Sequence, residues 1–79
     1  MLKIKDNVDL KELEKFGLVP NVWVIGGAYI KEENDVEKQI NCVPYQVVVY
    51  KDRQIRIYNQ SGNEILFDLI QAGFVEKVD

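Results

Sequence analysis

The stretch Tyr45–Asn59, YQVVVYKDRQIRIYN, constrains the fold of this chain more than any other. Two runs rich in β-branched and aromatic residues, Val47–Tyr50 and Ile55–Tyr58, suit the pleated, half-buried surface of a sheet. The charged residues between them predict a surface turn. Because no Gly or Asn supplies a positive φ there, we expect a loop of about three to five residues rather than a tight primed turn. The stretch is predicted to form a β-hairpin.

The register of this hairpin decides which side chains meet water, because successive strand residues point to opposite faces. In the favoured register the core face is aliphatic and carries Val47, Val49, Ile55 and Ile57. The outer face then carries Val48, Tyr50, Arg56 and Tyr58. In the alternative register Val48, Tyr50, Ile55 and Ile57 turn inward, and Val47, Val49, Arg56 and Tyr58 turn outward. Either outer face is compatible with an ordinary solvated surface or with a binding surface, since Tyr and Arg are enriched at interface hot spots.

The residues before the hairpin predict two strands and a helix. Leu2–Lys5 alternates apolar and basic residues, as an edge strand does. A helix of about two turns is expected after Asp9, which with Glu12 has capping-box spacing, and Gly17 suits its end. Asn21–Ile30, NVWVIGGAYI, predicts a strand buried on both faces. Its Gly26-Gly27 pair indicates a bulge or bend, because no phosphate-binding glycine motif accompanies it.

Residues 31–43 are polar and predict a solvated connection, with room for one helical turn through Val36 and Ile40. A calcium-binding loop is not expected there, because the central Gly of such loops is missing. Ser61 and Glu64 have the spacing of a second capping box, with Ser61 as the N-cap of a helix that runs to about Ala72. Phe74–Val78 then alternates as a short strand does.

These elements predict a single α+β domain over residues 1–79, with an antiparallel sheet of about three to five strands and two short helices on one of its faces. The apolar positions of the two helices are expected to enter the core. They are Leu10, Leu13, Leu66, Leu69 and Ile70.

The composition argues against catalysis and metal binding. The chain has no His and one Cys, so neither a zinc site nor an activated nucleophile is expected. We expect no catalytic residue, no cofactor and no metal. Cys42 is expected to be a small, half-buried apolar residue of a cytoplasmic protein, because no disulfide framework or signal-peptide core is present. No apolar run is long enough for a membrane span, and a net charge of −3 disfavours nucleic acid as a partner.

Two stretches resemble known families. Residues 4–18, IKDNVDLKELEKFGL, resemble the start of small uncharacterised proteins from phages and prophages of Gram-positive bacteria, which implies an accessory phage protein. Residues 66–77, LFDLIQAGFVEK, resemble the recognition helix and first wing strand of winged-helix DNA-binding domains. This second resemblance implies nucleic-acid binding, although the helix carries Glu64 and Asp68 and no Lys or Arg to neutralise phosphates.

The leading functional expectation is a non-enzymatic protein-interaction module that forms a homodimer through a sheet face. Two small helices cover only one face of a strongly apolar sheet, so another polypeptide is expected to cover the opposite face. The residues expected to line that face are Trp23, Tyr29, Tyr50, Arg56 and Tyr58. The alternatives are a winged-helix-like nucleic-acid-binding protein and a phage inhibitor that docks on a host enzyme.

Overall fold

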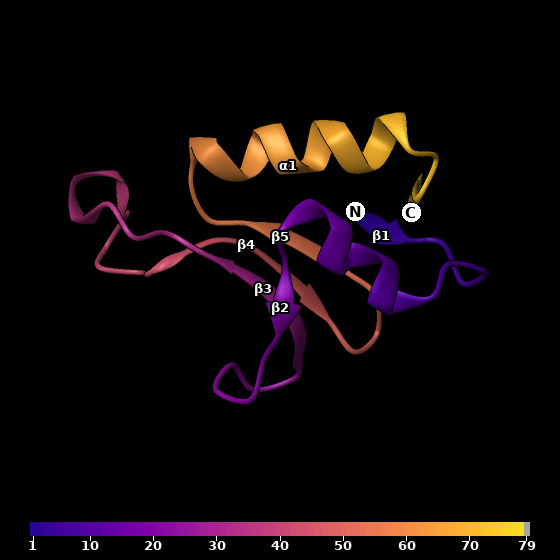
Figure 1. Cartoon of the computed structure of the whole chain (residues 1–79), viewed down its shortest axis with the longest axis horizontal. Coiled ribbons are helices and arrows are strands. Elements are labelled where there is room, and N and C mark those ends of the chain that lie inside the picture. Colours follow the sequence, from indigo (N-terminus) through magenta and orange to yellow (C-terminus); the bar gives the residue numbers. More distant parts are fainter. Residues whose placement is uncertain (79) are drawn as a thin grey trace.

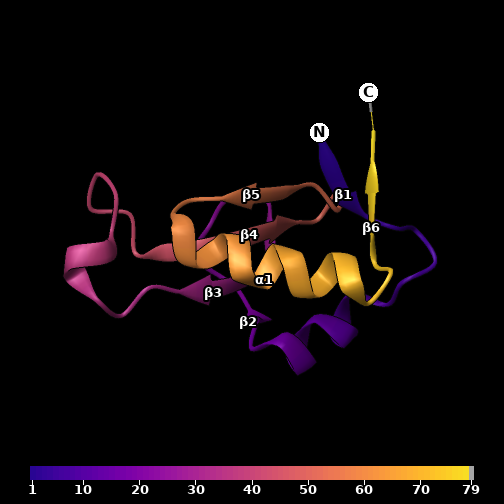
Figure 2. The ribbon, with the colours of Figure 1, turned by 90° about the horizontal axis from the view of Figure 1, so that it is seen from above.

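The predicted hairpin lies in a four-stranded antiparallel sheet in the computed structural model, which describes residues 1–78. The strands follow the order β2-β3-β4-β5, and helices cover one face, so the fold is α+β as predicted (Figures 1 and 2). Asp79 lies outside the described residues. The bounds of these strands are Val19–Pro20 for β2, Gly27–Glu32 for β3, Tyr45–Tyr50 for β4 and Ile55–Ile57 for β5.

The hairpin adopts the favoured register. Val47 pairs with Ile57, and Val49 pairs with Ile55, so these four side chains share one face. Val48 pairs with Arg56, which places the pair on the opposite face. We call the aliphatic, helix-covered side the inner face and the opposite side, with Val48, Tyr50, Arg56 and Tyr58, the outer face.

A second sheet of two strands joins the beginning of the chain to its end. Strand β1 (Leu2–Ile4) pairs antiparallel with β6 (Val75–Lys77), and the two lie side by side at one end of the molecule (Figure 2). Arg53, in the turn after β4, links this sheet to the hairpin. Its guanidinium donates hydrogen bonds to the carbonyls of Lys5 and Val8 at 2.8 and 2.6 Å, while its backbone adopts a φ of 75°.

Both predicted helices form, with one difference in capping. Helix η1 (Leu10–Phe16) is a 3₁₀ helix whose N-cap is Asp9, and Gly17 follows it in the left-handed conformation, as predicted. Helix α1 (Gln60–Gln71) ends at Ala72 and Gly73, also as predicted. Its N-cap is Asn59, whose side chain accepts from the backbone N–H of Gly62, so the assignment of Ser61 as the cap was wrong.

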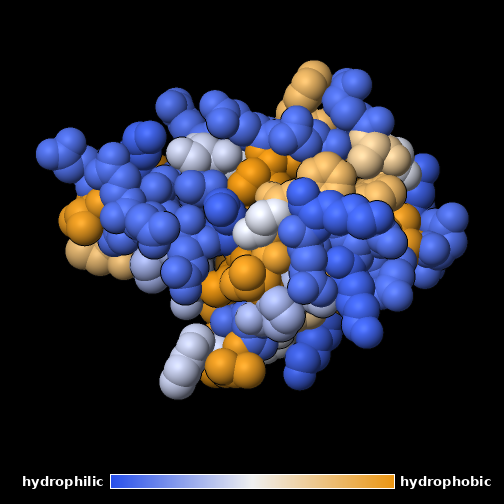
Figure 3. Space-filling model, viewed as in Figure 1, coloured by the Kyte–Doolittle hydropathy of each residue, from blue (hydrophilic) through white to orange (hydrophobic). Residues whose placement is uncertain are grey.

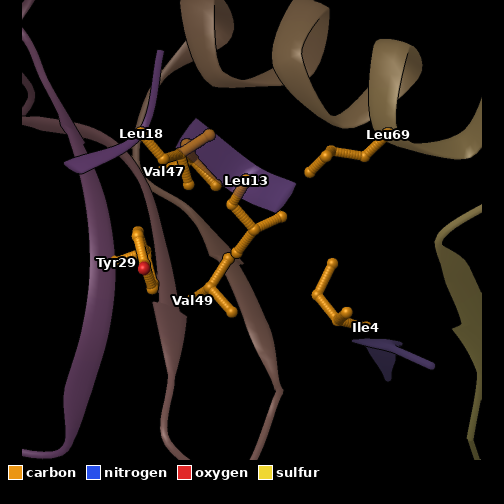
Figure 4. Packing of buried hydrophobic residues seen from close by; sticks show 7 residues of the cluster. All are labelled: Ile4, Leu13, Leu18, Tyr29, Val47, Val49 and Leu69. Atoms are coloured by element: carbon orange, nitrogen blue, oxygen red, sulfur yellow. The ribbon is translucent and has the colours of Figure 1, made fainter. Parts of the chain in front are cut away.

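The core lies between the two helices and the inner face (Figure 4). Its buried members are Ile4, Leu13, Leu18, Tyr29, Val47, Val49 and Leu69. Leu10 packs against this cluster as predicted, and Ile65 does so as well. Leu66 is half-buried outside the cluster and Ile70 is 47 % exposed, so these two core assignments were wrong. Because an α-helix has about 3.6 residues per turn, the position next to Leu69 points about 100° away from the core.

Helix α1 approaches the sheet closely at Gly62. This residue is buried, and a Cβ added to it would overlap the carbonyl oxygen of Gln46 in β4 and lie 3.1 Å from a methyl of Ile57. The helix therefore rests almost directly on the backbone of the hairpin. The absence of a side chain at Gly62 sets the distance between the two layers.

The predicted strand Asn21–Ile30 was wrong over its first half. Only Gly27–Glu32 forms β3, while residues 22–26 form a loop between β2 and β3. Gly26 turns the chain with a φ of 75°, and a register irregularity follows between Gly27 and Tyr29, so the expected bend at the glycine pair is present. Tyr29 and Ile30 are both buried, as a strand covered on both faces requires.

The polar connection after β3 contains a short 3₁₀ helix, η2 (Val36–Lys38), and extends beyond the sheet (Figure 1). It is held by the buried Glu33, which accepts hydrogen bonds from the Asn59 side chain at 3.0 Å and from the backbone N–H of Asp35 at 3.2 Å. Cys42 is exposed and has a φ of 62° in the turn at the far end, so its predicted half-burial was wrong.

Candidate functional site

The loop between β2 and β3 is closed by its own hydrogen bonds. The Asn21 carboxamide accepts from the backbone N–H of Trp23 at 3.0 Å and donates to the carbonyl of Val24 at 3.2 Å. The backbone N–H of Gly27 donates to the same carbonyl at 2.8 Å, and Gly26 supplies the positive φ that this turn requires. Residues 21–27 thereby form a compact loop closed by hydrogen bonds of its own.

The side chains at the tip of this loop are large, apolar and in water. Val22 is 84 % exposed, Trp23 is 83 % exposed and Ile25 is 97 % exposed. Figure 3 shows hydrophobic residues at the tip where this loop descends from the sheet, on the side away from α1 (Figure 1). We call residues 22–25 the apolar loop. Single exposed apolar residues are common, whereas a cluster of them on one hydrogen-bonded loop makes this loop a candidate contact surface.

Aromatic side chains and Arg56 organise the outer face beside this loop. The hydroxyls of Tyr50 and Tyr58 are hydrogen-bonded at 3.0 Å, so the two side chains together span this face of the hairpin. The guanidinium carbon of Arg56 lies 5.2 Å from the centre of the Tyr58 ring, within cation–π range. On the same face Val48 is fully buried although it is not part of the cluster beneath the helices, and its β3 partner Ile30 is buried as well.

The titration of Tyr58 reflects this arrangement. Its hydrogen bond with Tyr50 and, next, its burial raise the pKa of the Tyr58 phenol, while the nearby Arg56 charge acts in the opposite direction. The Tyr58 hydroxyl therefore stays protonated at neutral pH. The outer face presents this hydroxyl pair together with the guanidinium that lies over the Tyr58 ring.

The apolar loop and the outer face meet at Gly26. The backbone N–H of Lys51 donates to the carbonyl of Gly26 at 2.8 Å, and a Cβ at Gly26 would lie 3.8 Å from the Tyr50 ring. Between them lies an open pocket of about 540 Å³, whose lining includes Gly26, Tyr50, Lys51, Asp52 and Arg56. The loop, the pocket and the outer face thus form one continuous surface, which we call the binding surface.

Four of the five residues predicted for an interface belong to this surface. Tyr50, Arg56 and Tyr58 lie together on the outer face, and Trp23 lies on the adjoining loop. Tyr29 does not, because its pairing with Val49 places it on the inner face. There its hydroxyl donates to a Glu14 carboxylate oxygen at 3.4 Å. Burial and, next, the charge of that carboxylate raise the pKa of Tyr29.

Sequence reasoning missed Val22, Ile25 and Lys51 as parts of this surface. The apolar residues were assigned to a buried strand, and Lys51 was treated as a turn residue. Two signals were present in the sequence, namely Asn21 two positions before Trp23 and the Gly26-Gly27 pair. An Asn side chain that bonds to the backbone two residues on, followed by a Gly with positive φ, is typical of a tight loop.

In residues 1–78 no three His, Cys, Asp or Glu side chains come together as metal ligands. A second, smaller pocket of about 370 Å³ lies near the start of α1 and is lined by Lys38, Ile40, Asn59, Ser61 and Glu64, among others. No helix within the described range is long and apolar enough to span a bilayer.

Comparisons with known proteins give no relative for this chain. No protein-family model, no curated protein and no solved structure matches it.

Proposed function

We propose that this chain is a non-enzymatic protein-interaction module that binds another polypeptide through the binding surface. The observation that carries this proposal is the apolar loop, which holds Trp23 and Ile25 in water on a closed backbone. A preorganised loop loses little conformational entropy when it binds, so most of the free energy of burying its side chains is available for association. Fully burying Trp23 and two aliphatic neighbours is worth about 1.5–3 kcal/mol per side chain before the costs of association.

The chemistry of the outer face supports the same function. Trp, Tyr and Arg are the side chains most enriched at interface hot spots, and this surface has all three. The sequence supplies no His for proton transfer at neutral pH. Helix α1, the candidate recognition helix of the winged-helix resemblance, carries no Lys or Arg and packs on the hairpin. We therefore propose a protein rather than a nucleic acid as the partner.

The proposal is tested by site-specific photo-crosslinking in cells that express the chain. A photoreactive phenylalanine analogue at Ile25 is expected to form a discrete adduct with one polypeptide. The matched control carries the same analogue at Asn63, an exposed position of α1 on the other side of the sheet. No adduct from Ile25, or the same adducts from both positions, would contradict the proposal.

A separate measurement tests whether the partner is a second copy of this chain. An adduct of twice the chain mass would identify a second copy as the partner. Sedimentation velocity at micromolar concentration then checks self-association, which Trp23→Ser is expected to abolish without unfolding the chain. A strict monomer would exclude the homodimer and leave another polypeptide as the partner.

A further inference from the structure

We propose that the binding surface receives a peptide segment of another protein in which a carboxylate stands beside large apolar side chains. The juxtaposition that points to this partner is Arg56 and Lys51 in the pocket, directly beside the apolar loop. The inference rests on the proposed function and specifies the chemistry of its partner.

The charge of the pocket is opposite in sign to that of the chain. The chain has a net charge of −3, yet the pocket is lined by two cations and one carboxylate, that of Asp52. Within residues 1–78 the ion pairs formed at 4.0 Å or less involve Lys3 and Lys15, so neither Lys51 nor Arg56 has such a partner there. One oxygen of the Asp52 carboxylate is already engaged, because it accepts a hydrogen bond from the backbone N–H of Gln54 at 3.0 Å. The pocket therefore retains one positive charge for a ligand.

The geometry of Arg56 suits a carboxylate. Its guanidinium lies against the Tyr58 ring at 5.2 Å, and among the described residues it makes no hydrogen bond. A guanidinium held by an aromatic face keeps its planar fork of N–H donors available for a bidentate acceptor. A carboxylate matches this fork and the single surplus charge. A doubly charged phosphate matches less well, because it usually needs a cluster of arginines and would lie near Asp52.

Two other occupants fit less well. In a two-fold symmetric contact both copies use the same patch, so each copy would bring the surplus positive charge of its pocket into the interface. Like charges that face each other across an interface disfavour association. A lipid surface would contact the tip of the apolar loop, but it would leave the pocket and the Tyr50–Tyr58 pair without a role.

The test is selection of a displayed library of random dodecapeptides on the wild-type chain and, in parallel, on two double variants. One variant is Lys51→Gln with Arg56→Gln, and the other is Trp23→Ser with Ile25→Ser. All four side chains are exposed, so each variant is expected to have the same urea midpoint of unfolding as the wild type. Circular dichroism measures this midpoint. Peptides selected by the wild type are expected to place Asp or Glu next to aromatic or aliphatic residues.

A synthetic peptide from this selection then gives the magnitude. We expect Arg56→Gln to weaken its binding about tenfold or more, and Asp→Asn or Glu→Gln in the peptide to weaken it equally. Once the peptide carboxylate is gone, Arg56→Gln is expected to have almost no further effect, as in a double-mutant cycle. Arg56→Lys should restore only part of the affinity, because it keeps the charge and loses the fork.

The outcomes separate this inference from the proposed function. Apolar peptides without an excess of acid, selected equally by the wild type and the cation variant, would overturn the inference and leave the function standing. If no peptide were selected, self-association of the chain would overturn the inference. Sedimentation with vesicles of phosphatidylcholine and phosphatidylserine would also overturn it, provided that the Trp23→Ser, Ile25→Ser variant did not sediment with them. If no peptide were selected and Ile25 formed no crosslink, both proposals would fail.

Discussion

The two faces of the sheet bury neighbouring residues of β4 by different means. Val49 on the inner face and Val48 on the outer face are both fully buried. Val49 lies beneath the helical layer, in one cluster with Leu13 of η1 and Leu69 of α1 (Figure 4). Val48 belongs to no such cluster. It pairs with the buried Ile30 of β3, and the tyrosine pair and Arg56 lie on the same face.

This difference shows that a small domain can bury a strand residue without covering it with a helix. On the inner face, covering elements approach the backbone so closely that a methyl group cannot be added at Gly62. On the outer face the side chains of Tyr50 and Tyr58 are held by one hydrogen bond between their hydroxyls. Val48 is nevertheless fully buried there. The following changes test this division.

Gly62→Ala is expected to have the largest effect. Its Cβ would overlap the backbone carbonyl of Gln46, which cannot move away without disturbing the hairpin. We expect a loss of about 3 kcal/mol in the free energy of unfolding, measured by urea denaturation. The control is Asn63→Ala, one residue along the same helix and exposed, which should leave stability within about 0.5 kcal/mol. Equal midpoints for the two variants would contradict the close approach of α1.

A pair of valine truncations compares the two faces directly. Val49→Ala should cost about 2 kcal/mol, because the helices and strands around it can close the cavity only partly. Val48→Ala should cost about 1 kcal/mol, because the tyrosine side chains above it can settle into the space. Urea denaturation of both variants measures the difference. An equal or larger cost for Val48→Ala would show that the outer cover is as rigid as the helical layer.

Glu33 holds the connection after β3 to the residue that caps α1, and its contribution to stability depends on pH. Burial alone would raise the pKa of this carboxyl, but hydrogen bonds from the Asp35 backbone and then from Asn59, Ser61 and Gln46 outweigh it, so the pKa is lowered. A lowered pKa in the folded state contributes stability above the unfolded value of about 4.3, and this stability is lost as the pH falls through the folded value.

Glu33→Gln tests this contribution with a nearly isosteric side chain. We expect the variant to be less stable than the wild type at neutral pH. The loss should be smaller than that of Val49→Ala, because the amide oxygen of Gln can still accept a hydrogen bond. The difference should shrink as the pH falls below about 4.3. Denaturation curves between neutral and acid pH measure it, with the exposed Glu37→Gln as the control. A difference that stays constant down to strongly acid pH would contradict an ionised Glu33.

The sequence predicted the hairpin and its register because Val47, Val49, Ile55 and Ile57 alternate with other residues, and only one register gives an aliphatic face. It predicted the ends of the two helices because Gly17 and Gly73 each follow a series of apolar residues at helical spacing. It did not place Tyr29, because a strand apolar on both faces has no alternation to read, and the irregularity after Gly27 sets which side Tyr29 faces. It also missed the exposure of Val22 and Ile25, because apolar side chains favour burial and the closure of this loop depends on Asn21.

Tyr50→Phe is expected to have the smallest effect, and it probes the fastening of the outer cover. Removing one neutral hydrogen bond should cost about 0.5–1 kcal/mol at neutral pH. Because that bond is the largest cause of the raised pKa of Tyr58, the pKa of Tyr58 should fall toward its usual value.

The same bond makes stability depend on alkaline pH. A phenol with a raised pKa in the folded state contributes stability below its unfolded pKa of about 10, which is lost as the pH rises through the folded value. Ultraviolet absorbance titration of Tyr50→Phe measures the shift. Tyr45→Phe is the matched control, since Tyr45 meets the Tyr58 ring edge-on at 6.1 Å and its hydroxyl is not the one bonded to Tyr58. If both variants moved the Tyr58 titration equally, general packing rather than the hydroxyl pair would hold the outer cover, and the distinction between the two faces would lose its physical basis.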